Sequence, residues 1–507
     1  MRTRTILIGL VSIVILASLA ILLLPHLTAA PQPPEAEPAP PSYWPTQAWR
    51  TSTPEAGDFD SVKLAEGLQA LHDNEVPIDS LLIIRDGSVL LDAYFQPYDG
   101  TLPHDLASVT KSFTTTLIGI AAGQGKLKLD QTMVSVFPRR SIDNLGSRKQ
   151  SITITHLAGM MNGFESGCLA GDEPTLDAMR SNTDWVRAAL DRKMVRDPGL
   201  AFCYDSPGMH ILSAVLQETT GMTELDFGRQ YLFEPLGIRD VIWEADPQGY
   251  THGWGDLHLR PLDAAKLGYL FLSKGAWDGK QIVPASWVAD AVKFHNHAGE
   301  DDYGLGWWIN KDGYYAMGRG GQTIRVYPAY NAVIVATGSN LNYDQVDTVL
   351  RASFLSPDKP LPPNPEGVSK LKTTLATLAQ APAPMVTQTL PETARAISGK
   401  TFVFAAEAAQ RLYLVSARFE FNDAAESSLH LKLTYGEPTW RIGLDGKYHQ
   451  GSDGQALRGY WADSQTFVIE AFDVGVVTYQ FHFDGGDRVL LSSPNFSGEF
   501  EGLAGTQ

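Results

Sequence analysis

The chain has 507 residues, more than one ordinary domain, and its 44% hydrophobic content is enough for two or three packed units. A formal net charge of −17, with no Lys/Arg-rich run, argues against a nucleic-acid partner. Two cysteines exclude a disulfide-rich scaffold, and without a CxxC or HExxH motif no metal site is expected.

Residues 1–30 are predicted to be a signal anchor or transmembrane helix. Arg2 and Arg4 precede roughly twenty mostly apolar residues, which is about the length of a membrane span. The arginines favour a cytoplasmic N-terminus with the rest of the chain outside the cytoplasm. A cleaved secretion signal is the alternative, although Pro31 would then directly follow the best small-residue cleavage site. We expect a single-pass protein of the cell membrane with an extracytoplasmic catalytic domain, or a secreted protein if the segment is cleaved.

Residues 31–55 form a proline-rich, semi-rigid spacer, and residues 56–355 form the first predicted domain. From Ser80 the sequence indicates two strands joined at Asp86-Gly87, a common hairpin turn. Helices fill the middle of the domain, one of them from Leu262, and apolar strands are predicted at residues 314–328 and 332–338. This order predicts an α+β domain whose sheet is assembled from both ends of the segment.

A helix is predicted within residues 105–125, and its first turn carries Ser108 and Lys111. Side chains three residues apart share one helix face, so both point the same way at the positive end of the helix. A serine hydroxyl becomes a nucleophile when a neighbouring base takes its proton. Two further S-x-x-K runs, at Ser356 and Ser369, do not start an apolar helix. Taken alone, the pattern also fits a helix-start serine and a solvated lysine.

Residues 356–398 are predicted to be a proline-rich linker around one short helix, from Gly367 to Gln380. Residues 399–507 consist of short alternating runs separated by Asp-Gly turns. This pattern predicts an all-β sandwich or small barrel. No catalytic constellation is found in this C-terminal domain, and we expect its aromatic residues to form a core.

Segments spread from about Ser80 to Asn340 resemble the serine beta-lactamase and penicillin-binding-protein superfamily, in particular its class C-like branch of 6-aminohexanoate-dimer hydrolases and family VIII-type esterases. They are IIRDGSVLLDAYF, SVTK, GIAAGQGKLKLD, SITITHLAGMMNGF, PGLAFCYDSPGMHILSAVLQETTG, LFEPLGI, LRPLDAAKLGYLFL and GRGGQTIRVYP. The resemblance implies a beta-lactamase/transpeptidase-like α+β fold, an antiparallel sheet with helices, and a serine hydrolase that needs no cofactor or metal.

The resemblance also implies catalytic roles. Ser108 would be the nucleophile and Lys111 the general base, and Tyr204, in the second motif, would relay the proton. The third motif would lie at Arg319-Gly320-Gly321 on an edge strand, and the backbone amides of Ser108 and Gln322 would form the oxyanion hole. An interior hydrogen-bonded tyrosine is the alternative interpretation of Tyr204.

Substrate contacts are implied for several other positions. Ser206 and Gly320 replace the asparagine and the hydroxyl residue that hold a β-lactam in relatives, which favours an ester or a linear amide as substrate. Arg319 could receive a substrate carboxylate or be an exposed strand residue. These implied substrate-binding residues are Ser206, Arg319, Gly320, Gly321, Trp307 and Trp308. Both tryptophans could equally be core residues.

Cys168 and Cys203 flank the predicted site, and outside the cytoplasm they could pair. Two buried thiols are the alternative.

We therefore predict an acyl-enzyme hydrolase acting on a small ester, amide or peptide. One alternative is a D-alanyl-D-alanine carboxypeptidase or weak beta-lactamase of the cell envelope. A non-catalytic envelope binding protein is another, but a silent pocket would have no need for the set of Ser108, Lys111 and Tyr204.

Overall fold

The computed structural model describes residues 43–505, except residues 169–172, 356–360, 382, 384, 388, 424, 435, 452 and 496. The anchor predicted at residues 1–30 and residues 31–42 of the predicted spacer lie outside this range and stay predictions. The end of the predicted spacer is instead part of the first domain, because Arg50–Thr51 forms a strand of its sheet. Within the described residues, no helix has the length and apolar character needed to cross a bilayer.

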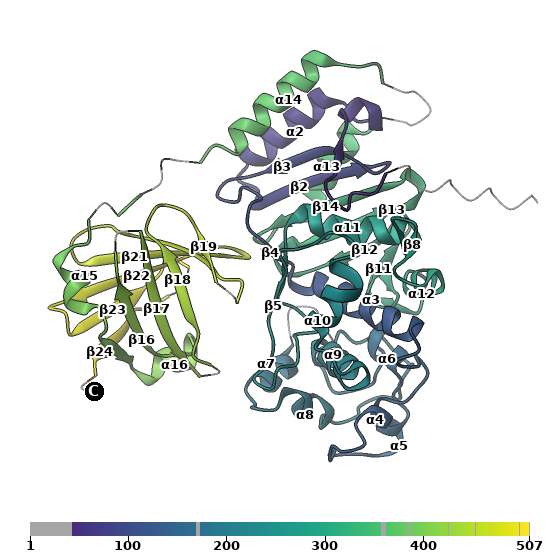
Figure 1. Cartoon of the computed structure of the whole chain (residues 1–507), viewed down its shortest axis with the longest axis horizontal. Coiled ribbons are helices and arrows are strands. Elements are labelled where there is room, and N and C mark those ends of the chain that lie inside the picture. Colours follow the sequence, from purple (N-terminus) through teal and green to yellow (C-terminus); the bar gives the residue numbers. More distant parts are fainter. Residues whose placement is uncertain are drawn as a thin grey trace, which may run out of the picture. The chain divides into compact units, whose positions relative to one another are not determined.

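The first domain is built on a nine-stranded sheet with the order β1-β3-β2-β14-β13-β12-β11-β10-β9 in the described residues (Figure 1). The strands are β1 (Arg50–Thr51), β2 (Ile78–Arg85), β3 (Ser88–Tyr94), β9 (Asn296–Ala298), β10 (Asp301–Tyr303), β11 (Trp308–Asn310), β12 (Gly313–Met317), β13 (Thr323–Tyr327) and β14 (Ala332–Gly338). β2 and β3 form the predicted hairpin, because Asp86 and Gly87 both adopt a positive φ. β14 pairs antiparallel with β2, so the sheet is assembled from both ends, as predicted.

Both faces of this sheet are covered by helices, which explains the apolar run in β2. Leu81 and Ile83 point into a core shared with α2 (Ser61–Asp73), α13 (Tyr343–Ser353) and α14 (Pro365–Leu378). Leu82 and Ile84 point the other way, into the core shared with α11 (Pro261–Leu272) and the remaining helices. A strand alternates its side chains, so a strand that is covered on both faces reads as continuously apolar.

The helical part surrounds α3 (Thr110–Gly123) and α9 (Ser206–Thr220). The shorter helices are α4 (Met133–Val136), α5 (Ser147–Gln150), α6 (Ile154–Ala158), α7 (Pro174–Arg180), α8 (Trp185–Leu190), α10 (Glu224–Gly228) and α12 (Ala285–Ala291). Small sheets accompany them, formed by β4 (His104–Asp105), β5 (Ile242–Trp243) and β6 (Leu257–Leu259), and by β7 (Ala276–Trp277) and β8 (Lys280–Gln281). The predicted helix starts later than residue 105, because Asp105 belongs to β4 and its carboxylate accepts a hydrogen bond from the amide of Ala107.

The third motif differs from its prediction. Residues 314–328 were expected to form one strand, but they form β12 and β13 with a turn at Arg319–Gly321. Gly320 and Gly321 have φ of 81° and 92°, values that glycine adopts without strain, and they reverse the chain. The turn joins two interior strands, so the expected edge-strand position is also wrong.

The helix predicted from Gly367 to Gln380 is α14, and Leu371 and Leu378 pack it into the same core as α2. It therefore belongs to the outer layer of the first domain, although the surrounding sequence is rich in proline.

The C-terminal domain is a ten-stranded antiparallel sheet in its described residues, with the order β18-β17-β16-β15-β24-β23-β22-β21-β20-β19. A further pairing of β18 with β20, at Gly443 and Arg458, closes it into a barrel. Its elements are β15 (Thr401–Phe404), β16 (Leu414–Phe421), β17 (Glu426–Leu433), β18 (Thr439–Gly443), β19 (His449–Gln450), β20 (Ala456–Trp461), β21 (Thr466–Asp473), β22 (Gly475–Asp484), β23 (Arg488–Ser492) and β24 (Phe500–Ala504), with α15 (Glu392–Ile397) and α16 (Ala406–Arg411). Phe402, Phe419 and Phe483 form its centre, as expected for core aromatics.

Candidate active site

Ser108 and Lys111 meet at the start of α3. Ser108 lies in the 3-10 turn Ala107–Val109 that precedes the helix, and Lys111 lies in the first helical turn. Lys111 Nζ is 2.7 Å from Ser108 Oγ and also donates to the carbonyl oxygen of Trp254 at 2.7 Å. The lysine is 2% exposed. A nitrogen held this close to a serine hydroxyl is in reach to take its proton.

Tyr204 lies beside this pair. Lys111 Nζ is 4.9 Å from the centre of the Tyr204 ring, and Trp308 stacks against the ring with a centroid separation of 6.4 Å. The structure thus brings the three predicted catalytic residues to one place, although they come from distant parts of the sequence.

Ser108 and Tyr204 border a cavity of about 410 Å³. A cavity of this size fits a small molecule. Five predicted site residues line it, namely Ser108, Tyr204, Ser206, Trp308 and Arg319, together with Ala107, Glu173, Leu176, Asp177, Trp254, Gly255, Asp256, Met317 and Gly318.

The Trp254 carbonyl, which accepts a hydrogen bond from Lys111, belongs to a loop. Four consecutive carbonyl oxygens of this loop accept hydrogen bonds from side chains. Trp243 Nε1 donates to the carbonyls of His252 (2.8 Å) and Gly255 (3.2 Å). The Thr114 hydroxyl donates to the Gly253 carbonyl at 2.8 Å, and Lys111 donates to that of Trp254. The sequence did not reveal this partner of the lysine, because any residue supplies a backbone carbonyl.

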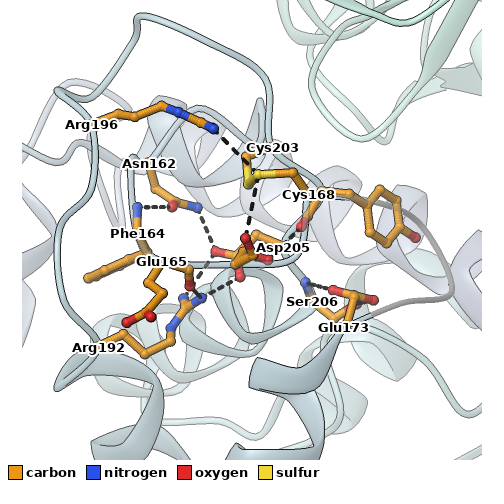
Figure 2. The surroundings of a disulfide bond; sticks show 12 residues. Asn162, Phe164, Glu165, Cys168, Glu173, Arg192, Arg196, Cys203, Asp205 and Ser206 are labelled. Carbon is orange, nitrogen blue, oxygen red and sulfur yellow. Dashed lines mark hydrogen bonds and ion pairs between the residues drawn. A yellow bond between two sulfur atoms is a disulfide. The ribbon is translucent and has the colours of Figure 1, made fainter.

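The second motif is held by charged side chains, which Figure 2 shows. Arg192 donates to both carboxylate oxygens of Asp205, at 2.5 and 3.0 Å, and Asn162 donates to one of them at 2.8 Å. Glu173 accepts from the amide and from the hydroxyl of Ser206, both at 2.7 Å. Tyr204 is therefore followed in sequence by two tightly held residues.

Cys168 and Cys203 form a disulfide in the structure (Figure 2), which settles the alternative that the sequence left open. The bond ends one residue before Tyr204, and a backbone bridge pairs Cys168 with Tyr204 itself. The Ser166 hydroxyl also donates to the Tyr204 carbonyl at 2.9 Å. The segment around Cys168 thus fixes the backbone of the tyrosine.

Four predicted site residues lie elsewhere. Trp307 is completely buried and packs on Phe271, because it points to the opposite side from its neighbour Trp308. Gly320 and Gly321 do not line the cavity, since they form the turn between β12 and β13.

The fourth is Gln322, which is completely buried. Its side chain donates to the Gly338 carbonyl at 2.6 Å and so ties two strands together. Gly318 takes the place next to the nucleophile: a Cβ atom there would lie 2.8 Å from the Ser108 amide nitrogen. Arg319 follows at the cavity wall, with its side chain 67% exposed and its guanidinium 3.7 Å from the Asp105 carboxylate.

Two carboxyl groups of this domain have raised pKa values. Burial raises the pKa of Glu224 to about 8, and burial together with the nearby Asp256 charge raises the pKa of Glu244 to about 9. Within the described residues, no group of three or more His, Cys, Asp or Glu is arranged to hold a metal ion.

Comparisons with known proteins find relatives of this chain in sequence and in fold. The chain is 25% identical to the protein flp of Staphylococcus aureus (strain MW2) over 182 residues, which are 34% of this chain and only 36% of flp. It is 23% identical to the 6-aminohexanoate-dimer hydrolase of Paenarthrobacter ureafaciens over 291 residues, 52% of this chain and 73% of the relative. A solved Bacillus anthracis structure, described as a candidate 6-aminohexanoate-dimer hydrolase, covers 66% of this chain and 89% of its own, with a TM-score of 0.50 and 20% identity.

The solved structure supports the fold alone. The family assignment rests on residues 64–354, more than half of the chain, which match the model of the family described as Beta-lactamase and so confirm the resemblance predicted from the motifs. The chain belongs to the beta-lactamase family.

Proposed function

We propose that the protein is a serine hydrolase that cleaves an ester or a linear amide through an acyl-enzyme on Ser108. The observation that carries this proposal is the 2.7 Å approach of Lys111 Nζ to Ser108 Oγ at the edge of a cavity that Tyr204 also lines. The similarity to a 6-aminohexanoate-dimer hydrolase over 52% of the chain supports it.

Lys111 in its neutral form takes the Ser108 proton while the serine oxygen bonds to the substrate carbonyl carbon. The tetrahedral intermediate then expels its alcohol or amine, and Tyr204 hands that group a proton which Lys111 replaces. Water attacks the acyl group by the same route and releases the acid. Side chains of the site thus accept the proton of Ser108 and supply the proton that the leaving group needs.

For the oxyanion hole we propose the amides of Ser108 and Arg319 in place of the predicted pair of Ser108 and Gln322. The close approach of Gly318 to the Ser108 nitrogen supports this assignment, because the next residue at the cavity wall is Arg319. A donor of this kind typically contributes about 3 to 4 kcal/mol to transition-state stabilisation.

The walls of the cavity favour an ester or a linear amide over a β-lactam. The Ser206 hydroxyl donates to Glu173 and is thereby occupied, so it does not replace the asparagine that grips a β-lactam side chain. Leu176, Trp308 and Met317 supply apolar surface for an acyl chain, and the exposed Arg319 guanidinium suits a substrate carboxylate.

Replacing the nucleophile tests the proposal. In Ser108→Ala, p-nitrophenyl butyrate hydrolysis should fall more than about a thousandfold in kcat/KM, because no acyl-enzyme can form. In the wild type, a fluorophosphonate adduct should map to Ser108 by mass spectrometry. The matched control is Ser112→Ala, a buried serine of the same helix that donates to the Gly306 carbonyl and should leave ester hydrolysis nearly unchanged.

Full activity of Ser108→Ala would contradict the proposal. Faster turnover of nitrocefin or of a D-Ala-D-Ala peptide than of the ester would favour the cell-envelope peptidase or beta-lactamase. A wild type with neither turnover nor adduct would favour a binding protein.

A further inference from the structure

The loop whose Trp254 carbonyl accepts a hydrogen bond from Lys111 also contains a hydrogen-bonded pair of side chains, His252 and Asp256. His252 Nδ1 lies 2.7 Å from Asp256 Oδ2. An ionised carboxylate only accepts hydrogen bonds, so Nδ1 carries the hydrogen. The histidine side chain is 6% exposed, whereas Asp256 reaches the cavity wall with 27% of its side chain exposed.

Two tryptophans fix the histidine ring between them. The ring centroid of His252 is 4.9 Å from that of Trp185 and 5.2 Å from that of Trp254, with interplanar angles of 22° and 19°. The stack leaves the imidazole little freedom to turn, and its hydrogen bond to Asp256 therefore has a set direction.

Asp256 adopts an unusual backbone conformation, with φ of 62°. A residue with a side chain is strained in this region, although Asp and Asn tolerate it better than most. Glycine would be unstrained here, but it would lack the carboxylate. In the structure that carboxylate accepts from His252.

The pair lies on either side of the residue whose carbonyl accepts a hydrogen bond from Lys111. His252 and Asp256 flank Trp254, and their hydrogen bond closes the loop from which the Trp254 carbonyl reaches Lys111 Nζ. A shift of this carbonyl would move the lysine nitrogen relative to Ser108 Oγ, which lies equally close on its other side.

We propose that His252 is a positioning residue, which acts with Asp256 to fix the Trp254 carbonyl that holds Lys111 against Ser108. This inference rests on the proposed function, because it gives His252 a role only if Lys111 is the base. His252 is too buried to contact a substrate and acts through the loop.

The chain offers a matched control. His210 on α9 forms a second buried His–Asp pair, 3.2 Å from Asp246, and its ring is 5.7 Å from the same Trp185. The two histidine rings are 6.3 Å apart. His210 does not belong to the loop that carries Trp254, so its loss should perturb the same core without moving the Lys111 partner.

Four variants of the full chain test the proposal with p-nitrophenyl butyrate. His252→Phe keeps a ring between the tryptophans but loses the hydrogen bond, and kcat should fall about tenfold to a hundredfold with KM changed by less than about twofold. His252→Asn places an amide nitrogen where Nδ1 was, and its kcat should fall clearly less than that of His252→Phe. Asp256→Gly relieves the backbone strain but loses the same hydrogen bond, so its kcat should match that of His252→Phe. The double variant His252→Phe/Asp256→Gly should lose no more kcat than either single variant.

His210→Phe should keep kcat within about threefold of the wild type. The proposal is overturned if His252→Phe or Asp256→Gly keeps wild-type kcat, if the loss appears in KM, or if His210→Phe loses as much as His252→Phe. If His252→Phe does not fold, Asp256→Gly decides. Activity remaining in Ser108→Ala would remove the proposed function, whereas an inactive Ser108→Ala beside a fully active His252→Phe would remove this inference alone.

Discussion

Glu224 shows how one buried group can make stability depend on pH. It is completely buried, its carboxyl lies near the hydroxyls of Thr114 and Ser213, and burial raises its pKa from 4.5 to about 8. The folded state therefore keeps the proton over a pH range in which the unfolded chain releases it.

The sign follows from this difference. Between pH 4.5 and about 8 the folded state binds more protons than the unfolded state, so the stabilisation present below pH 4.5 is lost as the pH rises through this window. Glu224→Gln has no proton to release, so its melting temperature should exceed that of the wild type at pH 8 and approach it near pH 4.5. Calorimetry at both pH values measures the gap.

The exposed Glu366 provides the control, since Glu366→Gln should shift neither melting temperature. An equal gap between Glu224→Gln and the wild type at both pH values would contradict this explanation.

Single residues also show what the sequence could reveal. Helical spacing indicated that Ser108 and Lys111 share one face, but their catalytic roles were implied by the resemblance to a family and not by the spacing alone. The directions in which Trp307 and Trp308 point could not be predicted. They depend on β11 starting at Trp308, just after the turn at Gly306. No local pattern marks that register.

Among the structural elements, the segment that carries Tyr204 depends most on a covalent tie. Tyr204 lies outside the helices and strands and is held by the Cys168–Cys203 disulfide and by one backbone bridge. In the chain-entropy model, closing a loop between cysteines with a sequence separation of 35 stabilises the fold by about 4 kcal/mol.

Breaking this bond should reduce both stability and turnover. Cys203→Ser should lower the melting temperature and also kcat on the aryl ester, because the backbone of Tyr204 loses its attachment to the segment around Cys168. Dithiothreitol should have the same effect on the wild type. The double variant Cys168→Ser/Cys203→Ser should not respond to the reductant, since the chain has only two cysteines. Reduced wild type with unchanged melting temperature and kcat would contradict this role.

At the same scale, the turn at Arg319–Gly321 was missed for a physical reason. Apolar residues flank it on both sides, and a glycine pair inside a strand also allows close approach of a ligand. The structure shows instead that the pair supplies two positive φ angles for a chain reversal. Distinguishing these two uses requires knowledge of the strand partners, which are far away in sequence.

Each of the two folded domains has a large hydrophobic core among the described residues. The core of the C-terminal barrel includes Phe419 and Phe483, and a core of the first domain includes Leu82 and Phe113. Proteins with more than one core commonly unfold in more than one step.

We therefore expect two calorimetric transitions. Phe419→Ala should lower one of them, because emptying a core aromatic site costs about 3 to 5 kcal/mol, while ester hydrolysis at 25 °C stays near the wild-type rate. Leu82→Ala should lower the midpoint temperature of the other transition. One common transition that moves in both variants would show that the cores unfold together.

Whole-molecule features were predictable where composition changes along the chain. The order of strands, helices and strands indicated an α+β domain, and Asp-Gly turns between alternating runs indicated the all-β domain. The choice between sandwich and barrel could not be made, because closure depends on one pairing between Gly443 and Arg458.

The pairing of β2 with β14 has a consequence for biosynthesis. Ser80 and Thr337, which share a hydrogen bond across these central strands, are 257 residues apart in the sequence. While the ribosome is still making the intervening helices, the β2–β3 hairpin has one open edge and no possible partner. The first domain must therefore stay incomplete until nearly all of it has been translated, and this edge of β2 stays unpaired until then.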